Sequence, residues 1–449
     1  MSRSIMWFRR DLRLSDNPAL LAAIEAGDEI VPVFILENEL IQATGAKGLA
    51  YLAASLKSLD EALKNKLHIC EGDPVEVLDN LKKKYKASSV HISTAYEPYG
   101  LARDSRIESA GVELTRTGSP YAVAPGRVKK PSDATNYRVY TPFYRGWLAH
   151  GWRAPVAAPK EIKAVTPDIA DRNFPTWIAP EETDIPLAGE KAAHERFKKF
   201  KAKGLDTYDE TRNFAGIDGT SKMSAHLTWG EIHPRTLLAG LGESKAHDTF
   251  RKEIAWREFY ADVLHNYPHT DKDYYAPQFA NMRYDEPGKK FNAWCEGKTG
   301  YPFVDAGLRQ LIKEGWMHNR VRMVVASFLA KDLHIEWQHG ALFFEEHLVD
   351  FDIASNAHGW QWTAGCGTDA SPYYRVFNPI EQGKRFDANG DYIRRYVPEL
   401  AHLNANEIHE PWDCADGYKN SYPKKIVEHA AERIESLARL EEIKVRNSE

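Results

Sequence analysis

Short apolar runs alternate with amphipathic segments over the first 130 residues, and this alternation constrains the fold more than any other feature of the chain. The apolar runs at 4–8, 30–36, 67–70, 89–93 and 112–115 have the length and continuity of strands that are buried on both faces. The segments between them, at 18–26, 48–64, 75–86 and 101–110, have helical periodicity. Strands and helices in regular alternation predict a doubly wound parallel sheet.

The turn after the first predicted strand lacks the glycines of a dinucleotide fingerprint. Its sequence is Phe8-Arg9-Arg10-Asp11-Leu12-Arg13, where a G-x-G-x-x-G pattern would be needed to bring the backbone close to a pyrophosphate. The usual way of binding a dinucleotide on such a sheet is therefore not supported.

After the first 130 residues the chain is first irregular and then helical. With 449 residues the chain exceeds a usual single core, so two domains are expected. The stretch from 126 to 189 is irregular and rich in proline, and after Glu190 strand patterns vanish while helical patterns continue to the end. We predict an α/β domain at 1–128, a linker at 129–189 and an all-helical domain at 190–449.

Composition excludes several classes of protein. Hydrophobic residues make up 43% and charged residues 27%, as in ordinary soluble globular proteins, and no run of 18 apolar residues predicts a membrane span. The N-terminus has no signal-peptide pattern, and the four cysteines are far apart with no metal-binding spacing, so a cytoplasmic location is expected. Since the net charge is −5, nucleic-acid binding would need a local basic patch.

Tryptophans gather between 315 and 362, where four of the 12 in the chain lie. Asp352, Asn356 and Trp360 recur at i, i+4 and i+8, so they form one stripe if the segment is helical. Trp362 then lies about 200° around the helix from Trp360, in a different environment. Indoles in such positions can stack on a flat ligand or relay an electron, and two ordinary core tryptophans fit the pattern equally well.

Two further segments have residue types suited to a ligand. Thr220, Ser221 and Ser224 lie at a predicted helix start, where backbone N–H groups and hydroxyls suit a phosphate, although a plain N-cap explains them too. Glu253 and Trp256 share one helix face with Arg257 and Tyr260, which suits a pocket that stacks a base and hydrogen-bonds its edge. An ordinary amphipathic helix fits this second segment as well.

The segment before a third predicted helix has polar groups that need partners. Asn319 and Met323 are i, i+4 neighbours, and Arg322 projects to another side. A ligand could satisfy these groups, or Asp350 could pair with Arg322.

Taken in this order, the motifs resemble the photolyase/cryptochrome family, and within it the class I cyclobutane pyrimidine dimer (CPD) photolyases. The resemblance spans the whole chain and is specific because many motifs match at the same spacing. Besides 220–224 and 315–323, the matching segments are Met6-Trp7-Phe8-Arg9-Arg10-Asp11-Leu12-Arg13, Trp256-Arg257-Glu258-Phe259-Tyr260, Gly297-Lys298-Thr299-Gly300-Tyr301-Pro302, Gly359-Trp360-Gln361-Trp362, Gly367-Thr368-Asp369-Ala370 and Phe377-Asn378-Pro379.

This resemblance implies a U-shaped FAD in the helical domain, active as FADH⁻, and an N-terminal antenna domain. It places Asn356 opposite flavin N5 and Arg257 near the phosphates. The other residues that it assigns to the cofactor are Tyr208, Thr220, Ser221, Met223 and Ser224 around the pyrophosphate, and Arg322, Asp350 and Asp352 around the isoalloxazine and ribityl chain.

The resemblance also implies a substrate, UV-damaged DNA that contains pyrimidine dimers, and a monomeric enzyme. Photoexcited FADH⁻ passes an electron to a flipped-out dimer, whose cyclobutane ring then splits; photolyases are a standard example of base flipping. The implied roles are stacking on the dimer for Trp256 and Trp362, completion of the pocket for Glu253, Asn319 and Met323, and contact with the DNA backbone for Arg320, Lys384 and Arg385.

Single positions distinguish the branches of the family. Enzymes of the (6-4) type resemble this region with histidines at the positions of Asn319 and Met323, and DASH-type members with glutamine for Met323 and tyrosine for Trp362. Signalling cryptochromes usually add a long tail after the terminal helix, predicted here at 424–446. These differences favour CPD repair, and a light-signalling protein without repair activity is the main alternative.

The photoreduction chain and the antenna depart from the most familiar pattern. Two family tryptophans match Trp360 and Trp337, but the outermost one aligns with Tyr284, so we expect Tyr284 to terminate electron transfer, with Trp294 as a possible substitute.

Glu97-Pro98-Tyr99-Gly100 resembles the members that bind a deazaflavin, which favours a deazaflavin or flavin antenna over a folate. The antenna should lie beyond the strand ends, near Trp7, Phe34 and Glu97.

Overall fold

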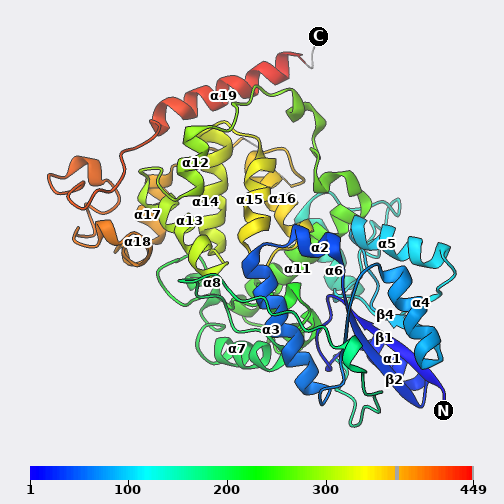
Figure 1. The fold of residues 1–449 in the computed structure, drawn as a ribbon. Helices are drawn as coiled ribbons and strands as arrows, with labels where there is room; N and C mark the ends of the chain where they lie inside the picture. The colour runs from blue at the N-terminus through cyan, green and yellow to red at the C-terminus, as the bar shows by residue number, and fades with distance from the viewer. Residues whose placement is uncertain (370–373, 447–449) are drawn as a thin grey trace.

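A five-stranded parallel sheet forms the centre of the N-terminal domain (Figure 1). The computed structural model describes residues 1–369 and 374–446, so Ala370 of the motif named above lies outside the described residues. The strand order is β3-β2-β1-β4-β5, which confirms the predicted parallel sheet. The strands are β1 (Arg3–Phe8), β2 (Glu29–Leu36), β3 (His68–Glu71), β4 (Ala87–Ile92) and β5 (Leu114–Arg116).

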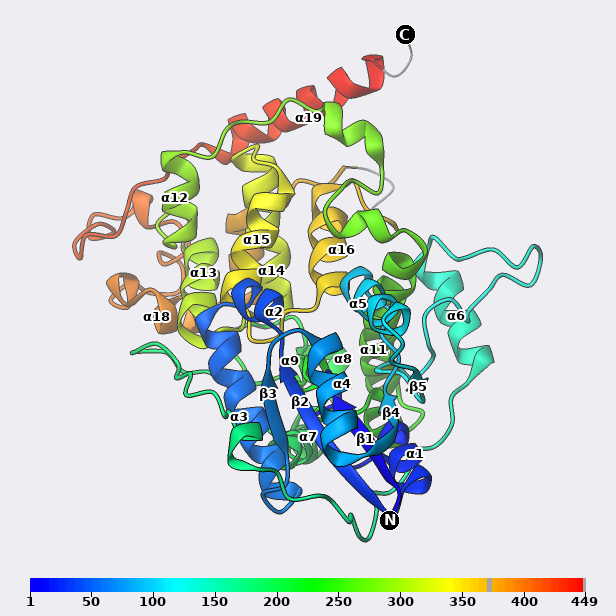
Figure 2. The same ribbon diagram turned by 45° about the vertical axis from the view of Figure 1, so that its right-hand side comes forward.

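Helices cover both faces of this sheet because the strands bury both sets of side chains. Met6 and Phe8 of β1 pack in one cluster with α1 (Pro18–Ala26) and α3 (Ala46–Ala62). Ile5 and Trp7 of the same strand pack on the opposite face with α4 (Pro74–Tyr85) and α5 (Pro98–Ser109), which lie in front of the sheet in Figure 2. A short helix after β2, α2 (Asn38–Ala43), was not predicted from the sequence.

The strand order reverses at β1, and this reversal positions a ligand site. The chain runs outward from β1 to β2 and β3, then returns to place β4 on the other side of β1. Open α/β sheets bind ligands at the carboxyl ends of the strands where the order reverses. Here those ends are Trp7 and Phe8 of β1 and Ser93 after β4.

The C-terminal part is helical, as predicted, and α19 (His429–Arg446) lies across its far end in Figures 1 and 2. Its other helices are α7 (Glu190–Lys203), α8 (Tyr208–Thr211), α9 (Ser224–Thr228), α10 (Pro234–Ala239), α11 (Lys245–Asn266), α12 (Lys289–Cys295), α13 (Pro302–Glu314), α14 (Asn319–Ser327), α15 (Trp337–His347), α16 (Ile353–Ala364), α17 (Pro379–Phe386) and α18 (Asp391–Tyr396). Among the described residues, no helix is both long enough and apolar enough to cross a membrane.

The prediction of an irregular connection between the domains is wrong for one segment. α6 (Tyr140–His150) packs against α11, and the indole N–H of Trp147 donates a hydrogen bond to Glu258 Oε2 at 2.6 Å. Pro142 is compatible with this helix because it lies in the first turn, where backbone N–H groups have no helical partner.

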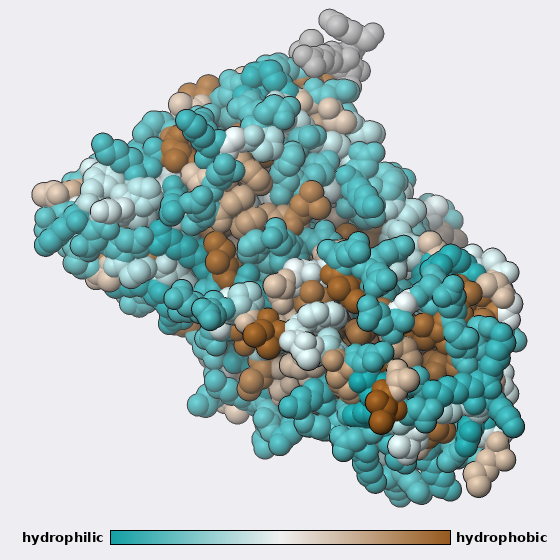
Figure 3. Space-filling view, viewed as in Figure 1, coloured by the Kyte–Doolittle hydropathy of each residue, from teal (hydrophilic) through white to brown (hydrophobic). Residues whose placement is uncertain are grey.

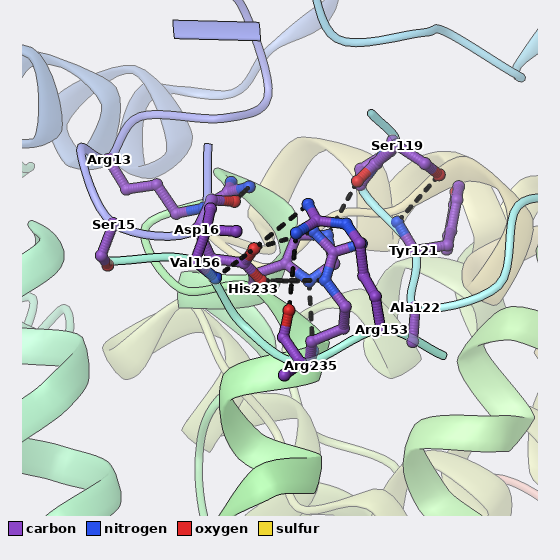
Figure 4. Close-up of polar contacts among 12 residues, drawn as sticks. Arg13, Ser15, Asp16, Ser119, Tyr121, Ala122, Arg153, Val156, His233 and Arg235 are labelled. Atoms are coloured by element: carbon purple, nitrogen blue, oxygen red, sulfur yellow. Dashed lines mark hydrogen bonds and ion pairs between the residues drawn. The ribbon is translucent and has the colours of Figure 1, made fainter. Parts of the chain in front are cut away.

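Buried charges join the N-terminal domain to the helical domain at Asp16 (Figure 4). The guanidinium group of Arg235 donates to both carboxylate oxygens of Asp16 at 3.0 Å, and Arg153 approaches Oδ1 at 3.4 Å. Burial, together with the charges of Arg13 and Arg235, holds the pKa of His233 well below its ordinary value. Neutral His233 therefore accepts from Arg235 N at Nδ1 and donates from Nε2 to the carbonyl of Ser119.

Candidate active site in the helical domain

Helix α16 carries the predicted site residues Asn356, Trp360 and Trp362 and has well-defined ends. The Asp352 side chain caps it by accepting from Ser355 N at 2.9 Å, and Gly365 ends it with a φ of 92°. Asn356 donates from Nδ2 to the carbonyl of Ala341 at 3.0 Å, which fixes its amide. Since the segment is helical, Asp352, Asn356 and Trp360 form the predicted stripe.

Asp350 and Arg322 form an ion pair that leaves one acceptor free. Arg322 Nη2 lies 2.8 Å from Asp350 Oδ2, while Arg322 Nε donates to the carbonyl of Met317. Asp350 Oδ1 is buried and has no hydrogen-bond partner among the described residues. A buried carboxylate oxygen without a donor is costly, so a ligand with an N–H or O–H group at this position fits the site. This is the observation that best fits a flavin ring here.

Asp352 faces the N-terminal domain as well as the helical core. Its Oδ2 pairs with Arg10 Nη2 at 2.8 Å across 342 positions of sequence. Burial alone would raise the pKa of Asp352, but the charges of Arg10 and Arg257 outweigh it and lower the pKa to about 2. The carboxylate is therefore ionised at neutral pH and ties the two domains together beside the predicted flavin site.

The segment predicted to hold the pyrophosphate is anchored by its backbone. Arg196 donates to the carbonyl oxygens of Ser221 at 2.7 Å and Thr220 at 2.8 Å. Ser224 opens α9 and accepts from the indole N–H of Trp316 at 3.1 Å, while Met223 is buried. These contacts leave the Thr220 hydroxyl without a hydrogen-bond partner in the part of the chain that the structure describes, available to a ligand.

Tyr208 of α8 packs against α11, and Arg257 lies on α11 itself. Tyr208 is buried, and its ring meets the ring of Phe250 edge to face with centroids 5.3 Å apart. Arg257 lies over the ring of Tyr121 and donates to the carbonyl of Pro120 at 3.2 Å. The predicted cofactor residues therefore come from five separate segments of the helical domain, at 208, 220–224, 257, 322 and 350–356.

Trp256 on α11 is held by a residue that the sequence analysis did not single out. The ring of Tyr140, from α6, stacks on it with centroids 3.7 Å apart and planes 8° from parallel. Glu253, one turn before Trp256, forms an ion pair with Arg212. Burial raises the pKa of Glu253 above its ordinary value, against the opposing effect of Arg212. This half-buried carboxyl group retains its proton at a higher pH than an exposed glutamate.

One aromatic contact brings Trp256 and Trp362 to the same region. Tyr260 of α11 stacks on His358 of α16, with ring centroids 5.6 Å apart and planes at 22°. Trp256 lies one helical turn before Tyr260, and Trp362 lies one turn after His358. The indole of Trp362 is half-buried and donates to the carbonyl of Asp369 at 3.1 Å.

Arginines gather around Arg320 with few carboxylates to balance them. Burial and the nearby charges of Arg212, Arg375 and Arg385 lower the pKa of Arg320 to about 10. Arg320 donates to the Asn213 amide oxygen at 2.8 Å, a neutral partner. Such a group of like charges suits the phosphates of a nucleic acid.

Three other predicted contact residues differ in their surroundings. Asn319 is exposed at the start of α14 and Met323 is half-buried one turn later. Lys384 forms an ion pair with Glu410, so its charge is already balanced within the chain.

A cavity of about 450 Å³ lies at the carboxyl ends of the strands, where the antenna was predicted. Trp7, Phe34 and Glu97 line it, and it extends to Arg257 and Ile353 of the helical domain. In Figure 3, apolar residues gather on the surface where α2 and its neighbours meet the helical domain.

Comparison with known proteins decides the family. The DNA photolyase family model matches residues 4–161, and the model for the FAD binding domain of DNA photolyase matches residues 250–442. A deoxyribodipyrimidine photo-lyase of Agrobacterium fabrum is 39% identical, covering 97% of this chain and 96% of the relative. The chain belongs to the photolyase/cryptochrome family.

Solved structures of other photolyases have the same fold. A bacterial class III photolyase from Agrobacterium tumefaciens gives a TM-score of 0.91 at 37% identity, covering 99% of this chain and 98% of that one. An archaeal photolyase from Sulfolobus tokodaii, described with two FAD molecules, gives 0.87 at 26% identity, covering 98% of this chain and 100% of that one. The predicted family and its FAD-binding domain are thus confirmed, while the class I assignment stays a prediction.

Two residues of this photolyase site, Arg212 and Tyr140, were missed from the sequence. Tyr140, Phe143, Tyr144 and Trp147 recur at helical spacing, which would have revealed α6 despite Pro142. Arg212 follows Tyr208 by one turn, but nothing in the sequence links it to Glu253, 41 positions away.

Proposed function

We propose that the chain repairs cyclobutane pyrimidine dimers in DNA by light-driven electron transfer, as a deoxyribodipyrimidine photo-lyase. One observation carries the proposal: Trp256 and Trp362 flank the Tyr260–His358 contact between α11 and α16. Two half-buried indoles in one region suit a pair of bases that have left the DNA stack. Curated relatives with the same name, at 39% and 36% identity over nearly the whole chain, support it.

FAD is the cofactor of this proposal, and bound reduced FAD supplies the photoexcited electron donor. The unpartnered Oδ1 of Asp350 would accept a hydrogen bond from the flavin ring, with Arg322 holding the carboxylate in position. Asn356 would present its amide to the ring edge. Thr220, Ser221, Met223, Ser224 and Tyr208 would hold the pyrophosphate region, with Arg257 near the phosphates and Asp352 beside the ring.

The dimer would be bound between stacking and polar groups. Each indole face, of Trp256 and of Trp362, replaces stacking lost from the duplex and is worth about 1–3 kcal/mol. Glu253 would hydrogen-bond the edge of the dimer, and burial favours the protonated, donating form of its carboxyl group against the opposing charge of Arg212. Asn319 and Met323 would complete the pocket.

DNA docking would use the arginines around the pocket. Arg320 and Arg385 lie in a group of guanidinium charges with a neutral hydrogen-bond partner, so phosphates would relieve their repulsion. Lys384 contributes less in this proposal, because Glu410 already neutralises it.

We further propose a class I CPD enzyme that acts as a monomer in the cytoplasm, with domains at 1–128 and 190–449 and a linker at 129–189. The four free cysteines are consistent with a reducing compartment. A deazaflavin or flavin antenna would occupy the cavity beside Trp7. The Sulfolobus structure with two FAD molecules supports a flavin there.

The test is light-dependent reversal of cyclobutane dimers in UV-irradiated oligothymidine by protein purified in the dark and chemically reduced. Recovery of thymine absorbance under blue light, and none in the dark, is the expected result. Absence of recovery by protein that retains reduced FAD and binds the DNA would overturn the proposal in favour of a light-signalling role.

A further inference from the structure

The two tryptophans predicted to relay electrons are buried without proton acceptors. Trp360 and Trp337 expose 3% and 2% of their surfaces, and neither indole N–H has a hydrogen-bond partner among the described residues. The Trp360 ring lies against Gly340, where an added Cβ would be 2.1 Å from Cη2, one turn along α15 from Trp337. An oxidised indole at either position therefore keeps its proton, and the positive charge remains mobile.

The next ring outward, Tyr274, does have a proton acceptor. It is 4% exposed and meets Trp337 edge to face, with ring centroids 6.3 Å apart. Its hydroxyl donates to the Glu336 carboxylate at 2.8 Å. Burial, Tyr284 and Glu336 raise the pKa of Tyr274, so the resting phenol is protonated. Glu336 is half-buried and so reaches solvent.

Tyr284, the residue that aligns with the third family tryptophan, has no carboxylate acceptor of its own in the described part of the chain. Its hydroxyl donates to the backbone carbonyl of Phe279 at 3.2 Å and also interacts with the hydroxyl of Tyr274, so its route to Glu336 passes through Tyr274. A peptide carbonyl is a far weaker base than a carboxylate and does not take up a phenolic proton. The Tyr284 ring stacks beside Tyr274, with centroids 6.4 Å apart and planes at 18°.

Trp294, the suggested substitute for Tyr284 as the last electron donor, is a second neighbour of Trp360. It also lacks, among the described residues, a group that could accept its proton. Its ring centroid lies 6.2 Å from that of Trp360, but the indole is fully buried and donates to the carbonyl of Val325 at 3.2 Å. An electron vacancy that reaches Trp294 would return to Trp360.

We infer that Tyr274 and Glu336 together end the photoreduction path, in place of Tyr284. Tyr274 gives one electron to the oxidised Trp337 indole and its phenolic proton to the Glu336 carboxylate, leaving a neutral tyrosyl radical and a neutral indole. The primary oxidant would be photoexcited oxidised flavin, reached through Trp360. An external thiol would later return a hydrogen atom to Tyr274, while Glu336 releases the proton it received to solvent. This inference rests on the flavin site proposed above.

The test follows light-induced radicals in the FAD-loaded protein by transient absorption and electron paramagnetic resonance. Tyr274→Phe should abolish the tyrosyl radical, leave an oxidised tryptophan and slow steady-state photoreduction by thiol about tenfold or more. Tyr284→Phe, a matched loss of one hydroxyl, should leave the radical. Glu336→Gln should slow radical formation several-fold and lower its solvent deuterium isotope effect.

A radical that persists in Tyr274→Phe and disappears in Tyr284→Phe would overturn the inference, as would an unchanged rate and isotope effect in Glu336→Gln. If Tyr274→Phe loses its FAD, Glu336→Gln decides alone. Dimer reversal by chemically reduced protein bypasses this path, so normal repair by all three variants is expected. Absence of repair by the wild-type protein would count against the proposed function and not against this inference.

Discussion

The two candidate ligand sites differ in how their charges are balanced. Around the N-terminal cavity, Arg103 pairs with Glu37 at 2.8 Å and with Asp104 at 3.2 Å, and Tyr99 donates to Glu37 at 2.8 Å. In the helical domain, Asp350 Oδ1 has no partner in the described part of the chain, and Arg320 is surrounded by other arginines.

This difference indicates what each site requires of its ligand. Arg103, Glu37 and Tyr99 at the N-terminal cavity are satisfied within the chain, so its occupant would bind there mainly by shape. Trp7 is 1% exposed and already has Arg9 and Arg103 over its ring. In the proposed function, the helical site takes a hydrogen-bond donor at Asp350 Oδ1 and phosphates near Arg320. Loss of a charge should therefore abolish function in the helical domain and affect only stability in the N-terminal domain.

The largest expected effect is on FAD binding by Asp350→Asn. This change keeps the size of the side chain but leaves the half-buried Arg322 without its counter-ion and removes the negative charge at the position proposed for the flavin N–H. FAD affinity should fall more than about 100-fold, measured by equilibrium dialysis of the apoprotein.

The matched control is Glu37→Gln, which removes a buried carboxylate that faces Arg103 in the N-terminal domain. It should lower the melting temperature and leave FAD affinity within about twofold, or about 0.4 kcal/mol. Equal losses of FAD in both variants would show that the contrast between the two sites is wrong.

A smaller effect is expected in the pH profile of repair. Because burial raises the pKa of Glu253, the protonated and hydrogen-bond-donating form persists above the ordinary glutamate range and is lost as pH rises through the raised pKa. The quantum yield of repair should fall about 5–10-fold as the pH rises through this pKa. The fall corresponds to the loss of one hydrogen bond worth about 1–1.5 kcal/mol.

Glu253→Gln supplies an N–H donor at every pH and should give a flat profile. The measurement is dimer reversal by chemically reduced enzyme, with flavin content checked at each pH. A flat wild-type profile would remove Glu253 from the role of donor.

The arginine group should control how DNA binding depends on salt. Arg320→Ala or Arg385→Ala should each reduce the slope of log K against log salt by about 0.9 and weaken binding about fivefold at moderate salt. Lys384→Ala is the control, because Glu410 neutralises that lysine. A larger effect at Lys384 than at Arg320 would indicate that DNA binds to another face of the protein. Fluorescence anisotropy with irradiated duplex DNA measures all three.

Local sequence patterns predicted the secondary structure of this molecule better than its long-range contacts. The five strands were located within two residues: β1, β2 and β3, which are largely buried, to within one residue, and β4 and β5, which include exposed polar residues, to within two. Helical spacing also gave the stripe on α16. α6 was missed because prolines on either side concealed its aromatic periodicity, although Pro142 lies harmlessly in its first turn.

Long-range contacts could not be predicted because no local pattern encodes them. The pairing of Arg10 with Asp352 joins the first strand's turn to a helix cap 342 positions away, and Tyr140 reaches Trp256 from the predicted linker. The resemblance to a family assigned roles to single residues, but it aligned Tyr284 with the third tryptophan and gave no sign of the hydrogen bond between Tyr274 and Glu336.

The smallest effect on function is expected from Tyr99→Phe in the N-terminal cavity. The change removes a hydrogen bond to Glu37, which keeps its ion pair with Arg103. The free energy of unfolding should therefore fall by about 1 kcal/mol. FAD affinity and repair by chemically reduced enzyme should not change, since the helical site uses none of these groups. Tyr96→Phe is the matched control, because no hydrogen bond of the Tyr96 hydroxyl is found in the described residues, and its melting temperature should equal that of the wild type. Loss of FAD from Tyr99→Phe alone would mean that the N-terminal cavity supports the flavin site through Arg10 and Asp352, and that the two sites are a single cooperative unit.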